Sequence, residues 1–259
     1  MIYCVLLVYS KEYYKKTLSE FEKLVKSLEV DDYKIIIVNN NPDLLFKFDI
    51  LGNNDGLEFS GWDSAVSFIR KKYIFKNDYI VFANDTFCQH RKWGIYQKYK
   101  FSHAFNNFIQ SKLSGLCGEK NKISESFRIS DIEIDGWIST YLFIISSDLL
   151  DNYNLKFDNV TGAESEFYSY VTETGVQFNP DFDLNLAQHL NNWLFPLDPS
   201  KGWYKSRHAP LSVKENKLKS ILNEKKLTAN VLYNGGKVVD INSFFIPKVI
   251  NFLKKLFGR

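Results

Sequence analysis

GNNDGLEFSGWDSAVSFIRKKYIFKNDYIVFANDT, residues 52–86, is the stretch that decides the fold. It predicts a polar loop, then a helix that carries Gly61 and Trp62, and then a buried apolar strand over residues 78–83. Asp85 comes just after the end of that strand. In open α/β sheets ligands bind at the carboxyl ends of the strands, so Asp85 is expected beside a binding crevice. A carboxylate after an apolar strand is also a common structural feature, and that alternative stays open.

The segment before this stretch predicts a strand–helix–strand unit. Residues 2–8 are a nearly continuous apolar run, which is typical of a parallel strand buried on both faces. A helix is expected over residues 11–29 with Ser10 as its N-cap, followed by a second buried strand over residues 33–38 and a short third strand over residues 48–51. This order predicts a right-handed βαβ unit, and therefore the α/β fold class.

The rest of the chain predicts further strands and helices. The expected elements are strands over residues 113–118, 141–145 and 175–180, and helices after Glu166 and over residues 181–193, 214–227 and 243–259. The last of these is basic and amphipathic, without acidic residues, and such a helix at a chain end predicts contact with a membrane surface. Docking of this helix onto the protein's own core or onto a partner is the alternative.

Composition describes an ordinary globular protein. Of 259 residues, 45% are hydrophobic and 24% are charged, which excludes a disordered chain. The net charge of +3 is too small to indicate a nucleic-acid partner, and the aromatic and basic segment 87–108 is interpreted as a solvated helical face. The three cysteines have no regular spacing and are expected to be reduced thiols. Without a signal peptide or a spanning apolar run, a cytoplasmic location is expected, with peripheral contact at the inner face of the cell membrane through the last helix.

Three segments carry a resemblance to a known family: IIIVNNNPD at residues 35–43, GNNDGLEFSGWDSA at residues 52–65 and DYIVFANDT at residues 78–86. In this order they resemble the nucleotide-sugar half of GT-A glycosyltransferases, and are most similar to bacterial family 2-type enzymes and the rhamnan-synthesis group of cell-surface polysaccharide assembly. The resemblance covers residues 2–90 well and 130–210 loosely. It implies a GT-A, Rossmann-like and mostly parallel sheet flanked by helices.

The resemblance also implies a division of the chain and an activity. Residues 1–210 would form the catalytic domain, with residues 1–110 binding the nucleotide sugar and residues 111–210 the acceptor. Residues 211–259 would be a C-terminal helical extension. The implied reaction moves a sugar, with inversion, from a nucleotide-sugar donor to a glycan or lipid-linked acceptor in O-antigen or capsule-type biosynthesis. A non-catalytic glycan-binding scaffold derived from a transferase and a nucleotidyltransferase are the alternatives.

Residues expected at the donor are polar or aromatic side chains at strand ends, in the loop–helix segment and in a late basic turn. They are Tyr9, Asn39, Asn40, Asp43, Trp62, Asp63, Asn84, Asp85 and Arg207. Turn formation alone also explains the amides after residue 38. The resemblance implies a Mg²⁺ or Mn²⁺ ion held by Asp85 and His208, although the family's metal motif is reduced here to Asn84-Asp85-Thr86, with an amide in place of its first aspartate.

The remaining expected residues concern the acceptor and its deprotonation. Trp137 would stack on the acceptor sugar, and a half-buried core tryptophan is the alternative reading. The resemblance places the base at Glu164 or Glu166, and Asp135 is a further candidate acid or base. Thr161 and Glu164 also fit a capping box, which would be a structural use of Glu164.

Overall fold

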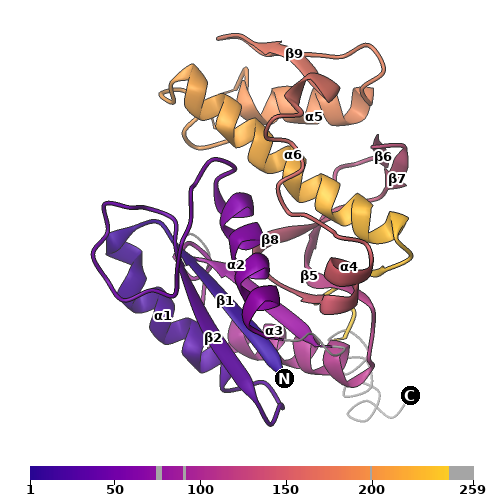
Figure 1. Cartoon of the computed structure of the whole chain (residues 1–259). Coiled ribbons are helices and arrows are strands. Elements are labelled where there is room, and N and C mark those ends of the chain that lie inside the picture. Colours follow the sequence, from indigo (N-terminus) through magenta and orange to yellow (C-terminus); the bar gives the residue numbers. More distant parts are fainter. Residues whose placement is uncertain (74–77, 90–91, 199, 245–259) are drawn as a thin grey trace, which may run out of the picture.

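One large mixed sheet forms the centre of the protein (Figure 1). The computed structural model describes residues 1–73, 78–89, 92–198 and 200–244. In the described part of the chain the sheet has seven strands in the order β11-β5-β8-β4-β1-β2-β3. Strands β4, β1, β2 and β3 are mutually parallel, whereas β8 runs antiparallel to both of its neighbours, β4 and β5. The α/β class with a mostly parallel sheet flanked by helices is therefore confirmed.

The first half of the chain follows the predicted order closely. Its elements are β1 (Ile2–Val8), α1 (Lys11–Val25), β2 (Tyr33–Asn39), β3 (Ile50–Leu51), α2 (Glu58–Lys72), β4 (Tyr79–Asn84) and α3 (Ile95–Gln110). Every residue of β1 is buried, as its uninterrupted apolar sequence predicts. Helix α1 ends near Val25, a few residues before the predicted end, because the chain turns there toward β2.

The second half differs more from the prediction. Its elements are β5 (Gly115–Asn121), β6 (Phe127–Ile129), β7 (Ile132–Ile134), β8 (Trp137–Ser146), α4 (Ser147–Asn152), the 3₁₀ turn η1 (Glu164–Glu166), β9 (Tyr168–Val171), β10 (Val176–Phe178), α5 (Leu184–Leu194), α6 (Leu211–Tyr233) and β11 (Lys237–Asp240). The amphipathic helix predicted after Glu166 was wrong, because those residues form η1 and β9, and β9 pairs with β10. The predicted basic helix at residues 243–259 lies, from residue 245 on, outside the described residues.

Two hydrophobic clusters cover the two faces of the large sheet. Helices α1 and α3 pack on one face, where Phe21 and Phe105 meet alternate residues of β1. Helices α2, α4 and α6 pack on the other face, where Trp62 and Phe59 meet Phe82 and Phe143. The sheet is therefore a buried middle layer, which explains why its strands read as apolar runs.

Helix α6 joins the sheet to a smaller layer built from β6, β7, β9, β10 and α5 (Figure 1). Leu227 and Val231 of α6 pack against the large sheet, while Leu218 and Leu222 pack against the smaller layer. Strand β11, which follows α6, pairs in parallel with β5. Residues 211–240, assigned from the sequence to an extension, are thus packed into the main body of the protein.

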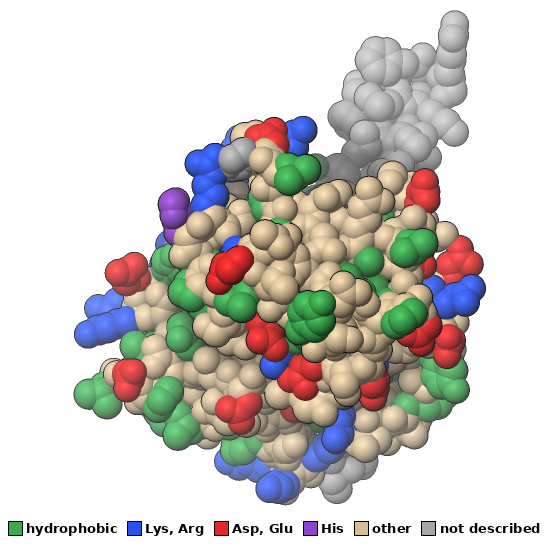
Figure 2. Space-filling view, turned by 90° about the horizontal axis from the view of Figure 1, so that it is seen from above, with side chains coloured by type: hydrophobic (Ala, Val, Ile, Leu, Met, Phe, Trp, Pro, Cys, Tyr) green, Lys and Arg blue, Asp and Glu red, His purple; other side chains and the backbone are tan. Residues whose placement is uncertain are grey.

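The surface carries mixed charge on the face shown in Figure 2, where acidic, basic and hydrophobic side chains are interspersed. All three cysteines are buried free thiols, as predicted. Among the described helices, none has the length and hydrophobicity that crossing a bilayer requires.

Candidate functional site

The strands β1 and β4 are neighbours in the sheet, and their carboxyl ends lie at its switch point. From β1 the sheet continues through β2 on one side, and through β4 and β8 on the other. Ligands of open α/β sheets bind at such switch points. A cavity of about 500 Å³ lies there, which we call the strand-tip cavity. It is lined by Leu7, Tyr9, Asn40, Asn54, Leu57, Glu58, Asn84, Asp85, Thr86, Trp203, Lys205, Val213, Asn216 and Lys217. The ends of the second and fourth strands, at Asn40 and Asp85, therefore border one cavity.

Asp85 fixes the start of helix α1 from across the sheet. Its Oδ2 accepts hydrogen bonds from the backbone N–H groups of Tyr9, at 2.8 Å, and Ser10, at 2.6 Å. The hydroxyl of Thr17, inside α1, donates to the carbonyl oxygen of Asp85 at 2.8 Å. Ser10 occupies the N-cap position as predicted but makes no side-chain cap bond; Asp85 holds this residue through its backbone N–H instead.

Asn40 holds the loop that precedes α2. Its Nδ2 donates to Asn54 Oδ1 at 2.7 Å and to the carbonyl of Leu57 at 2.9 Å. Leu57 has φ of 53° and ψ of −132°, a backbone conformation that a residue with a Cβ rarely adopts. Asn40 Oδ1 is buried without a hydrogen-bond partner among the described residues. Strain and an unsatisfied polar atom at one point of a cavity are typical of functional sites.

Glu58, the first residue of α2, lies where the strand-tip cavity meets a second cavity. Ser220 of α6 donates to its carboxylate at 3.3 Å. Burial raises the pKa of the Glu58 carboxyl, an effect that the nearby Lys217 partly offsets. A half-buried carboxylate with a raised pKa that faces a cavity is a candidate for proton transfer.

The second cavity, which we call the tryptophan cavity, has a volume of about 600 Å³. Its lining includes the rings of Trp137, Tyr141, His189, Trp193, Trp203 and Tyr204, the polar residues Asn121, Ser139 and Thr140, and the charged residues Glu58, Lys122, Lys217, Glu224 and Lys225. Five lining residues are shared with the strand-tip cavity: Glu58, Asn84, Thr86, Trp203 and Lys217. The two cavities thus adjoin at these residues, and we call the pair the cleft.

Glu224 of α6 orients the floor of the tryptophan cavity. Its Oε2 accepts from Trp137 Nε1 at 2.8 Å, and its Oε1 accepts from the backbone N–H and the hydroxyl of Thr140 at 2.8 and 3.1 Å. The ring of Trp137 is therefore held in one orientation, with one face under Lys225 at 3.7 Å from Nζ to the ring centroid. Burial, and then the charge of Lys225, lowers the pKa of the adjacent His189 to about 4, so this imidazole is neutral.

Of the predicted donor residues, the structure brings four to the strand-tip cavity: Tyr9, Asn40, Asn84 and Asp85. Asn39, Asp43 and Arg207 do not line it. Asn39 makes turn contacts, donating to the carbonyl of Leu44 and accepting from the N–H of Asn41. The turn-forming alternative therefore describes the contacts of Asn39.

Trp62 and Asp63 lie away from both cavities. Trp62 is fully buried in the aromatic cluster under the sheet, edge-on to Phe82, Phe143 and Phe157. Asp63 accepts from the backbone N–H groups of residues 157 and 158, both at 2.9 Å, and burial raises the pKa of its carboxyl to about 6. These contacts tie α2 to the segment before η1.

Three predicted catalytic carboxylates also lie outside the cleft. Asp135 pairs with Lys120 at 2.6 Å and has a side chain that is 80% exposed. Glu164 pairs with Lys219 at 2.6 Å, and although burial opposes it, this hydrogen bond holds the pKa of Glu164 below its usual value. Thr161 and Glu164 do not form the predicted capping box, because the 3₁₀ turn begins only at Glu164 and the carboxylate of Glu164 faces α6.

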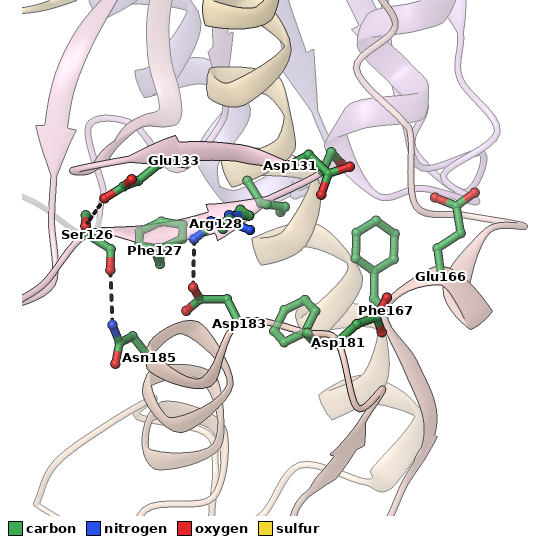
Figure 3. A pocket seen from close by; sticks show the side chains of 13 residues that line it. Ser126, Phe127, Arg128, Asp131, Glu133, Glu166, Phe167, Asp181, Asp183 and Asn185 are labelled. Carbon is green, nitrogen blue, oxygen red and sulfur yellow. Dashed lines mark hydrogen bonds between the residues drawn. The ribbon is translucent and has the colours of Figure 1, made fainter.

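Glu166 lines a separate cavity of about 480 Å³ between β6, β7 and the segment around α5 (Figure 3). Most of the acids there are engaged: Glu133 accepts from Ser126, and Asp183 accepts from the N–H of Arg128 and caps α5 at the N–H of Leu186. Lys226 lies 3.5 Å from Glu166. Because most of the acidic side chains of this cavity pair with neighbouring residues, they do not converge on a ligand in the way that the polar side chains of the cleft do.

The residues predicted to bind a divalent cation do not fit one tightly. Oδ2 of Asp85 accepts two backbone hydrogen bonds, and His208 is absent from the linings of both cavities that form the cleft. Within residues 1–73, 78–89, 92–198 and 200–244, no three His, Cys, Asp or Glu side chains are grouped for metal binding. Divalent cations prefer several oxygen ligands. The cations that do line the strand-tip cavity are Lys205 and Lys217.

Sequence reasoning missed Glu58, Lys217, Glu224 and Lys225. The signal for Glu58 was present, because it belongs to the loop–helix stretch 52–86 that organises the fold. The signal in α6 was hidden, because a sequence dense in Lys and Glu is typical of a solvated helix. Only the burial of α6 between two layers places these charged side chains in a cleft.

Comparison with known proteins does not assign this site to a family. A scan against models of protein families and a search of curated proteins each found no match.

Proposed function

We propose that the protein is a nucleotide-sugar-dependent glycosyltransferase of the GT-A type, in which the strand-tip cavity binds the donor and the tryptophan cavity binds the acceptor. The observation that carries the proposal is the pair of adjoining cavities at the switch point, with the carboxylate of Glu58 in the lining of both. A transfer reaction needs both substrates side by side and a base between them.

Each cavity suits its substrate. The strand-tip cavity offers the polar side chain of Asn84 and the ring of Tyr9 beside two lysines, which match a polar nucleotide and its diphosphate. The tryptophan cavity is lined by several aromatic rings, of which Trp193 and Trp203 stack on each other with an interplanar angle of 20°. Sugar rings pack their C–H faces on such surfaces.

Glu58 would act as the base. The acceptor hydroxyl attacks the anomeric carbon, a new C–O bond forms, the bond from that carbon to the diphosphate oxygen breaks, and the hydroxyl proton passes to the Glu58 carboxylate. Attack opposite to the leaving group inverts the anomeric centre. This assignment replaces Glu164 and Glu166, which face lysines outside the cleft.

Lys205 and Lys217 would neutralise the departing diphosphate. Both line the strand-tip cavity, and Lys217 also lines the tryptophan cavity. Preorganised cations at a developing negative charge lower the barrier in the same way as a metal does. No step of this mechanism is routed through Mg²⁺ or Mn²⁺.

We further infer that the acceptor is a glycan, free or lipid-linked, and that the protein works in the cytoplasm, at the inner face of the membrane when the acceptor is lipid-linked.

The test is a thermal-shift panel of UDP-, GDP- and dTDP-sugars, followed by transfer assays with the sugar that stabilises the protein. A ligand at 100 times its Kd adds about 2.7 kcal/mol to the free energy of unfolding, which the panel detects. Stabilisation by one nucleotide sugar and its turnover support the proposal. Absence of both at millimolar concentration contradicts it and favours a glycan-binding protein that uses the tryptophan cavity alone.

A further inference from the structure

A buried lysine without an anionic partner lines the tryptophan cavity. Lys225 of α6 is 1% exposed, and its Nζ lies over the ring of Trp137. Among the described residues no hydrogen bond or ion pair reaches this Nζ. A buried ammonium group normally has both, because removing it from water is costly.

The nearest acid does not fill this role. Glu224 precedes Lys225 in the chain, but its two carboxylate oxygens accept hydrogen bonds from Trp137 and Thr140. Burial lowers the pKa of Lys225 to about 7, and Glu224 only partly offsets this effect. An anion that binds at Nζ would restore the charge of the amine and satisfy its donors.

The charges around Lys225 also favour an anion. Lys122 and Lys217 line the same cavity, and the acids of its lining are Glu224, which is engaged, and Glu58, whose pKa is raised by burial. His189, which is neutral, adds no charge. The lining therefore contains three lysines, Lys122, Lys217 and Lys225, and two glutamates, Glu58 and Glu224.

The aromatic rings of the cavity indicate which kind of molecule carries the anionic group. Trp137, Trp193 and Trp203 line the cavity around Lys225, and the volume of about 600 Å³ is in the range of small-ligand sites. A flat, C–H-rich ring with an acidic substituent satisfies both the aromatic faces and the amine. A simple inorganic anion would leave the aromatic faces bare.

We propose that the tryptophan cavity binds a sugar that bears an anionic group, a carboxylate or a phosphate, and that Lys225 is the residue that recognises this group. If this sugar is the acceptor of the proposed transferase, the acceptor glycan is acidic, and that statement rests on the proposed function. The binding of an acidic sugar requires only the tryptophan cavity.

The experiment is a titration followed by tryptophan fluorescence, because Trp137 contacts Lys225 directly. The probes are a tetrasaccharide of alternating glucuronic acid and N-acetylglucosamine, the same tetrasaccharide with its carboxyl groups reduced to alcohols, and N-acetylglucosamine 1-phosphate. The variants are Lys225→Met and, as a matched control, its neighbour Lys226→Met. Lys226 belongs to the same helix but pairs with Glu166 outside the cleft.

We expect the wild type and Lys226→Met to bind at least one acidic probe at least ~10-fold more tightly than the reduced tetrasaccharide, and Lys225→Met to lose that preference, as loss of one charge-assisted hydrogen bond predicts. Preference for the tetrasaccharide identifies a carboxylate, and preference for the sugar phosphate identifies a phosphate. Equal binding of acidic and neutral probes by the wild type, or an unchanged preference in Lys225→Met, overturns the inference.

The same samples separate this inference from the proposed function. Calorimetric titration with UDP, GDP and dTDP tests the strand-tip cavity, which Lys225 does not line. A Lys225-dependent preference without nucleotide binding supports the acidic-sugar site and contradicts the transferase. Nucleotide binding without that preference does the reverse.

Discussion

Oδ2 of Asp85 lies 2.6 Å from the backbone nitrogen of Ser10, and this hydrogen bond ties the end of β4 to the start of α1. The same oxygen accepts the N–H of Tyr9. The residue that the sequence singled out as a metal ligand thus also anchors the two residues that precede a helix distant in the chain. The first expected effect of substituting Asp85 is therefore a change in the stability of the protein.

We expect Asp85→Ala to lower the free energy of unfolding by about 1–3 kcal/mol, because the backbone N–H groups of Tyr9 and Ser10 lose their charged acceptor. Asp85→Asn retains one acceptor oxygen and should cost less. Urea denaturation measures both. If Asp85→Ala unfolds like the wild type, these hydrogen bonds contribute little to the stability of the protein.

Glu58→Gln should lower kcat at least ~100-fold, because the amide cannot accept the acceptor's proton. Burial raises the pKa of Glu58, so the folded state disfavours its ionised form, and a neutral glutamine should leave the protein at least as stable. A loss of activity with unchanged unfolding therefore reports chemistry. The measurement is steady-state transfer with the nucleotide sugar that the thermal-shift panel identifies.

Glu164→Gln and Glu166→Gln are the matched controls for Glu58→Gln. Each removes a carboxylate that pairs with a lysine of α6 outside the cleft, so kcat should change less than about 3-fold, because neither carboxylate lines the two cavities. A loss of kcat at Glu164 or Glu166 as large as the loss expected at Glu58 would move the base to that residue.

The sequence predicted the elements whose pattern is local, and failed where burial comes from distant segments. The apolar runs of β1, β2 and β4 predicted a parallel sheet and brought Asn40 and Asp85 to one edge, because parallel strands end on the same side. The strand β9 was missed because YSYV also fits one turn of an amphipathic helix. Glu58 was passed over for Glu164 and Glu166 because only tertiary packing shows which carboxylate faces the cleft.

Lys217→Met tests whether cations replace a metal at the diphosphate. We expect the Kd for the nucleoside diphosphate and the KM for the donor to rise ~10-fold or more, because a charge-assisted contact is lost. In the wild type, turnover should be the same in EDTA as in excess Mg²⁺ or Mn²⁺. Loss of turnover in EDTA that added metal restores would contradict the assignment and return Asp85 to the role of metal ligand. Lys219→Met, on the same helix but paired with Glu164, is the control.

Lys225 should make the free energy of unfolding depend on pH, and the variant Lys225→Met should lack this dependence. Burial lowers the pKa of Lys225 from 10.5 to about 7 in the folded protein, and the charged groups that act on it are Glu224 and Lys217. Between these two values the unfolded chain holds a proton on this amine that the folded protein has lost. The unfolded state then binds more protons, so the contribution of Lys225 to the free energy of unfolding rises with pH from about 7 to 10 and is constant below that interval.

The measurement compares urea unfolding of the wild type and Lys225→Met from pH 6 to pH 9. Groups that titrate in both proteins cancel in the difference, and His189, which faces Lys225, is neutral throughout this range because its pKa is about 4. Lys225→Met should be the more stable protein at pH 6, where the wild type buries a charge without an anionic partner, and its advantage should shrink steadily toward pH 9. A difference that does not change with pH would show that Lys225 keeps its ordinary pKa, and that the cavity already contains the counter-charge that an acidic sugar would supply.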